Sequence, residues 1–64
     1  MALQYVIRIE DEEITESTVQ KMEPWQVKQV CSFLDNERDL RRLQQWIKGN
    51  VVLEAYIERL IDLT

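Results

Sequence analysis

The sequence predicts a mostly helical α+β protein, with one N-terminal β-strand followed by three or four short helices. Three observations lead to this fold class: apolar and polar residues alternate near the N-terminus, apolar residues then recur at helical spacing, and the 64 residues include one Gly and one Pro. The longest uninterrupted apolar runs of the chain, such as 51–53, are far too short to cross a membrane. We expect residues 1–64 to form a single small domain.

The first expected element is a half-buried strand over about residues 2–10, where β-branched and aromatic residues alternate with polar ones. A run of acidic residues follows, and we expect this concentration of like charge to end the strand. No second strand is evident, so the unpaired backbone groups along the strand edges need partners. We expect a homodimer in which the strand pairs with its twofold mate; a strand added to another protein's sheet and a hidden short strand within the chain are the alternatives. The apolar face of this dimer strand comprises Leu3, Tyr5, Ile7 and Ile9.

Two helices are expected in the middle of the chain. The first covers about residues 13–22, with Ile14 and Val19 on its apolar stripe and acidic residues in its first turn, where the helix dipole favours them. The second covers about residues 24–34 and begins at Pro24, because proline lacks only an N–H that the first helical position does not use. Its apolar stripe has the spacing of one buried helical face: Val27, Val30, Cys31 and Leu34.

The C-terminal part predicts two further helices, over about residues 37–48 and 51–63. Asn36 is a suitable N-cap for the first, and Asn50 for the second. Between them, Gly49 can adopt the left-handed conformation that commonly ends a helix. The last helix has a broad apolar surface for a helix that ends a small protein.

The small size and the missing residue types restrict the function classes. A single core in a chain of this length seldom supplies more than ~3–5 kcal/mol, so oligomerisation or a partner that completes the core is favoured. One Cys excludes an internal disulfide, and the absence of His excludes histidine-based metal binding and general-base catalysis. We therefore expect a non-enzymatic protein without cofactor or metal. The lone Cys31 and the lack of a signal-peptide pattern are typical of a cytoplasmic protein.

The acidic run is the first candidate for a partner-binding surface. The chain carries a net charge of −4, and a concentrated negative surface steers association with a basic partner. A solvated turn and helix start explains the same residues without any function. Trp25, beside Pro24 at a helix start, is a possible exposed anchor for a partner. The acidic residues concerned are Glu10, Asp11, Glu12, Glu13 and Glu16.

A basic, amide-rich helix face is the alternative working surface. Such a face occurs in nucleic-acid-binding proteins, although an overall negative charge repels phosphate. Ion pairing within the helix, for example between Glu37 and Arg41, explains it more simply. The residues that share this face are Arg38, Arg41, Gln45 and Lys48.

These features favour a small, acidic, cytoplasmic protein that acts as a regulator or inhibitor by occupying a surface of a larger, basic partner. Small phage-encoded antagonists, including anti-restriction and anti-CRISPR proteins, have this size and charge. The order of strand and helices also resembles that of ribbon-helix-helix dimers, which would imply a DNA-binding transcriptional regulator that reads the major groove with its paired strands. The exposed strand face here would carry a single basic residue, Arg8, followed by the acidic run.

Overall fold

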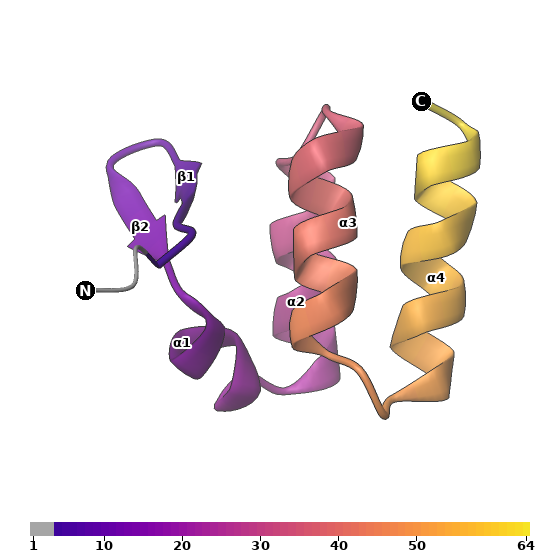
Figure 1. Cartoon of the computed structure of the whole chain (residues 1–64), viewed down its shortest axis with the longest axis horizontal. Coiled ribbons are helices and arrows are strands. Elements are labelled where there is room, and N and C mark those ends of the chain that lie inside the picture. Colours follow the sequence, from indigo (N-terminus) through magenta and orange to yellow (C-terminus); the bar gives the residue numbers. More distant parts are fainter. Residues whose placement is uncertain (1–3) are drawn as a thin grey trace.

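A computed structural model describes residues 4–64 and shows an α+β protein that is mostly helical. A small hairpin lies at one edge of the molecule above the first helix, and the last helix lies at the opposite edge (Figure 1). The second and third helices lie between them, the second behind the third in this view. The described residues contain four helices, and three or four were predicted. In chain order the elements are β1 (Ile7–Ile9), β2 (Glu12–Ile14), α1 (Glu16–Gln20), α2 (Pro24–Ser32), α3 (Glu37–Trp46) and α4 (Val51–Asp62).

The prediction that the N-terminal strand has no partner within the chain was wrong. β1 pairs antiparallel with β2, and Ile7 lies opposite Ile14, with both side chains buried. The acidic run does not end the sheet, because Glu12 and Glu13 are exposed while their backbones pair with those of Ile9 and Arg8. Of the predicted dimer face, Ile7 is buried, Tyr5 and Ile9 are half-buried, and Leu3 lies outside the described residues.

The turn of the hairpin contains a backbone conformation that its residue does not favour. Glu10 has φ 54, in the left-handed region, whereas the next residue, Asp11, has a negative φ. Asparagine tolerates this region better than glutamate, because its short polar side chain bonds locally to the backbone. We expect Glu10→Asn to stabilise the protein by about 0.5 kcal/mol.

The measurement is the urea midpoint of unfolding, with Asp11→Asn as the matched control. Both changes remove one negative charge from the same turn, but only the first falls on a left-handed residue. Equal midpoints for the two variants would contradict this explanation.

The first helix begins later than expected. Ile14 belongs to β2, so it does not contribute to a helical stripe, and α1 starts only at Glu16. Thr15 is the N-cap, and its hydroxyl accepts a hydrogen bond from the backbone N–H of Thr18 at 3.4 Å. Pairing in β2 buries Ile14 in the core, whereas the Ser and Thr residues of a longer helix would favour helix only weakly. Residue 14 is therefore part of the strand.

The three longer helices begin at the residues expected from their caps. Asn36 accepts a hydrogen bond from the backbone N–H of Asp39 at 2.8 Å, and Asn50 accepts one from that of Leu53 at 3.2 Å. Gly49 has φ 110 between α3 and α4. α2 has Pro24 at its first position, as predicted, and the Gln26 side-chain oxygen accepts a hydrogen bond from the Glu23 backbone N–H at 3.0 Å.

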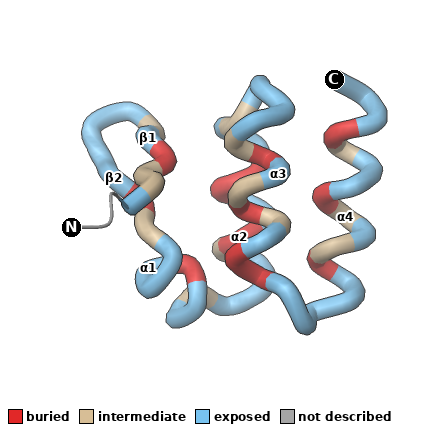
Figure 2. Tube along the Cα trace, viewed as in Figure 1, coloured by how far each residue is buried: buried red, intermediate tan, exposed pale blue. Residues whose placement is uncertain are grey.

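The buried residues are red in Figure 2, and those of α4 lie on the side of the helix that faces α3. The aromatic residues differ in how far they are buried. Trp46 is buried and Tyr56 is half-buried, but Phe33 is 54% exposed. The core comprises Ile7, Ile14, Val19, Val27, Val30, Cys31, Leu40, Leu43, Trp46, Ile47, Leu53, Ile57 and Ile61.

Tyr5 contacts three residues of α3 and so connects the N-terminal segment to that helix. Its hydroxyl donates a hydrogen bond to the Asp39 carboxylate, and its ring lies 6.3 Å from Trp46 in an edge-on arrangement. The Arg42 guanidinium lies 4.5 Å from the centre of the same ring. The bond to Asp39 raises the pKa of Tyr5, because the phenol must keep its proton to donate. This attachment holds the hairpin at a defined position beside the helices.

Candidate protein-binding surface

Four of the five acidic residues singled out in the sequence lie together on the hairpin. We call Glu10–Glu13 the acidic hairpin; all four residues are exposed. Glu13 forms an ion pair with Arg8 across the strands at 3.0 Å, with both side chains more than half exposed. Within residues 4–64, the carboxylates of Glu10, Asp11 and Glu12 form no hydrogen bond or ion pair. The negative charge of the turn is therefore available to a partner.

Glu16 lies on a different element and in a different setting. It is the first residue of α1, and its carboxylate accepts a hydrogen bond from the Gln20 amide at 3.4 Å. It lines a polar hollow with Gln20 and Arg42. The structure thus separates Glu16 from the acidic hairpin, with which the sequence grouped it.

An apolar groove lies between the acidic hairpin and α2. Its volume is about 210 Å³, and Glu12 of the acidic hairpin is part of its wall. The sequence did not predict this groove, because the groove depends on how the hairpin packs beside α2. The one available signal was that Phe33 lies off the stripe of Val27, Val30 and Cys31. The apolar part of the lining comprises Ile9, Ile14, Met22, Val30 and Phe33, and the polar part comprises Glu12, Gln26 and Gln29.

Trp25 is exposed on α2, as expected from its position beside Pro24. It is 60% exposed, and its indole N–H donates a hydrogen bond to the Glu23 carboxylate at 2.7 Å. Trp25 precedes Gln29 by four residues, and Gln29 precedes Phe33 by four, so the three lie along one side of the helix. The two exposed aromatic rings and the groove therefore lie on neighbouring parts of the surface.

The basic face of α3 is already engaged in part within the chain. Arg38, Arg41, Gln45 and Lys48 are all exposed, but Lys48 lies in the turn after α3, which ends at Trp46 and not at residue 48 as predicted. Arg41 forms the expected ion pair with Glu37, at 2.7 Å. That hydrogen bond raises the pKa of Arg41, with smaller contributions from the nearby acids Glu58 and Asp62 of α4. Acidic side chains thus lie among the basic ones, which reduces the positive potential that phosphate would meet.

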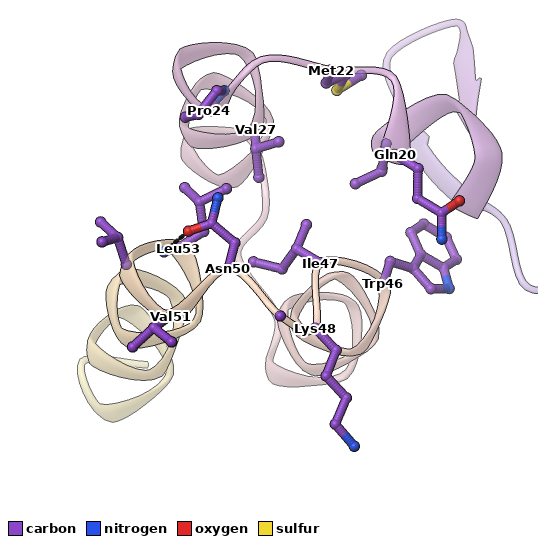
Figure 3. A pocket seen from close by; sticks show the side chains of 13 residues that line it. Gln20, Met22, Pro24, Val27, Trp46, Ile47, Lys48, Asn50, Val51 and Leu53 are labelled. Carbon is purple, nitrogen blue, oxygen red and sulfur yellow. Dashed lines mark hydrogen bonds between the residues drawn. The ribbon is translucent and has the colours of Figure 1, made fainter.

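The largest hollow lies at the end of the molecule where all four helices meet (Figure 3). Its volume is about 600 Å³, and buried apolar side chains such as Val27, Ile47 and Leu53 form much of its lining. Lys48 is its single charged lining residue, and Gln20 and Asn50 lie at its margin. A proton-transfer site needs a base or acid held by a second group, and this lining offers no such pair.

The remaining chemistry-bearing side chain is Cys31. It is buried on the inner face of α2, and burial raises the pKa of its thiol to about 11. At neutral pH the thiol therefore stays protonated, and it packs as a small apolar group. Across residues 4–64, no three Cys, Asp or Glu side chains are arranged to hold a metal ion.

Comparison of the chain with models of known protein families, with curated proteins and with solved structures finds no match. The helices of the described residues also lack the length and apolar character needed to cross a lipid bilayer.

Proposed function

We propose that the protein is a non-enzymatic binding module, a regulator or inhibitor that occupies a surface of a larger, basic partner. The observation that carries this proposal is the juxtaposition of unpaired carboxylates and accessible apolar surface. Glu10, Asp11 and Glu12 lie beside a groove that includes Phe33, and Trp25 is exposed nearby. Charged groups at the rim of an interface speed association, and buried aromatic anchors supply much of the affinity.

The class of partner follows from the sign of the charge. A negative hairpin fits a positively charged protein surface, and the surfaces with the strongest positive potential in cells are those that bind nucleic acid. We therefore propose a cytoplasmic antagonist of a nucleic-acid-binding protein, of the kind that phages encode against host restriction or CRISPR systems.

The alternative is direct binding to DNA as a dimeric regulator. In ribbon-helix-helix proteins the strands of two chains pair and enter the major groove. Here β1 uses one edge to pair with β2, and Arg8 of the exposed strand face is joined to Glu13. Both observations favour the protein partner over DNA.

The test is affinity capture from the source cells with the chain tagged at its C-terminus, followed by assay of protein and nucleic acid in the same eluate. We expect a basic protein to be retained and to be released by added salt. Nuclease treatment before elution distinguishes the two classes, since a protein bound directly persists. Retention of duplex DNA alone would replace our proposal with the alternative.

A homodimer remains part of the proposal, with a changed geometry. β1 has a second edge, which β2 does not occupy, and a twofold mate could add to it. We expect light scattering at micromolar concentration to give twice the chain mass of 7.7 kDa. Val6→Pro should weaken the dimer, because proline removes a backbone donor next to β1. A monomer with a cooperative unfolding transition would contradict this prediction.

A further inference from the structure

The apolar groove between the acidic hairpin and α2 has the dimensions of a side-chain pocket. Ile9 and Ile14 contribute from the strands, and Val30 and Phe33 from the other side. Its volume is about 210 Å³. A cavity of about 150 Å³ lined by comparable side chains accepts benzene. The groove therefore has room for one large apolar side chain, such as Leu, Met or Phe.

The groove is left open by the chain itself. Phe33, at its edge, is 54% exposed, and Ile9 is only half-buried. Covering these side chains would remove apolar surface from water, which is the main source of affinity at protein interfaces. The amide groups of Gln26 and Gln29 lie in the same wall and can bond to the backbone of a bound segment.

The charges around the groove indicate which residues of a bound segment would flank its apolar side chain. Glu12 lies in the groove wall, and Glu10 and Asp11 lie in the adjoining turn. At the amino end of α2, the Glu23 carboxylate accepts a hydrogen bond from the Trp25 indole N–H. Lys28 of α2 instead lies 5.2 Å from the Tyr56 ring of α4, on another side of the helix. A segment in the groove would therefore meet the carboxylate of Glu12 and those of the adjoining turn.

We infer that this groove binds a basic segment of the partner protein that inserts one large apolar side chain between flanking Lys or Arg residues. The inference rests on the proposed function and adds the chemistry of the recognised segment. The apolar side chain fills the space between Ile14 and Phe33, and the flanking cations lie against Glu12 and the turn. The acidic hairpin thus acts in both steering and recognition.

The experiment uses two synthetic peptides, rich in lysine and alanine, which differ only at a central position that is Phe in one and Ser in the other. Each is titrated into isotope-labelled protein and followed by amide chemical shifts. We expect the Phe peptide to bind at least about tenfold more tightly, because its ring is buried. The largest shifts should occur at Ile9, Glu12, Gln29 and Phe33.

Two variants with the same charge change locate the site. Gln29→Lys places a cation in the groove wall and should weaken binding of the Phe peptide about tenfold. Ala55→Lys adds the same charge to an exposed position of α4, at the opposite edge of the molecule from the hairpin (Figure 1), and should leave binding unchanged.

The outcomes separate this inference from the proposed function. Equal binding of both peptides, with shifts confined to the acidic hairpin, would overturn the groove inference while the proposed function stands. Failure of the Phe peptide to bind would also overturn it, and affinity capture of a basic protein would then still support the proposed function. A preference for the Phe peptide that Gln29→Lys removes and Ala55→Lys does not would support the groove.

Discussion

Leu43→Ala is expected to remove most of the stability of the protein at 25 °C. Leu43 has no exposed surface and lies on α3, which packs against both α4 and α1. Truncating a buried leucine to alanine costs about 3–4 kcal/mol, because it removes apolar contacts and leaves a cavity. A domain of this size has a free energy of unfolding of ~3–5 kcal/mol, so this one substitution removes most of it.

The measurement is thermal unfolding followed by far-ultraviolet circular dichroism. Leu63→Ala is the matched control, since Leu63 is 80% exposed and its truncation should cost at most about 0.5 kcal/mol. If Leu43→Ala instead melted close to the wild type, the stability of the protein would come from contacts outside this core.

Reversing the charge of the hairpin turn is expected to slow association with the basic partner about tenfold at low salt. The variant Glu10→Lys with Asp11→Lys changes the net charge from −4 to 0, since each reversal adds two. These two residues are exposed and have no ion pair in the described part of the chain, so the fold should survive. Glu13 is left unchanged, because a lysine there would face Arg8.

The control places the same charge change elsewhere. Asp35→Lys with Asp62→Lys also gives a net charge of 0, on exposed positions outside the hairpin that have no ion pair in the described residues. Stopped-flow or surface-binding kinetics should show a loss of on-rate and of its salt dependence only for the hairpin variant. Equal slowing by both variants would show that net charge, and not the hairpin, controls the encounter.

The competing surface predicts the opposite pattern. If the basic face of α3 binds nucleic acid, neutralising Arg38, Arg41 and Lys48 to Gln would be the damaging change. The hairpin reversal would then be harmless or would even strengthen binding, because it removes repulsion of phosphate. Circular dichroism of each variant verifies that the fold is retained.

The candidate surface could be predicted only in part from the sequence. Its acidic residues were found because charge is read directly from composition, and the exposure of Trp25 followed from its place at a helix start. The groove could not be predicted, because it forms between side chains of the hairpin and of α2, and the sequence does not show how these pack together. Phe33 illustrates this: an aromatic residue in a small chain is usually core, but here α2 ends before it and it lies at the rim.

The sequence by itself determined where the longer helices start and how they are oriented. Pro24, Asn36 and Asn50 act on backbone groups within the next turn, and apolar spacing selects the inward face, so no distant partner is needed. Only the tertiary structure decided the pairing of β1 with β2. The three residues of β2, two of which are acidic, show no strand pattern in the sequence. They pair with β1 because this pairing buries Ile14 opposite Ile7 in a core that the helices complete. Strand pairing depends on that shared burial, which a local pattern does not reveal.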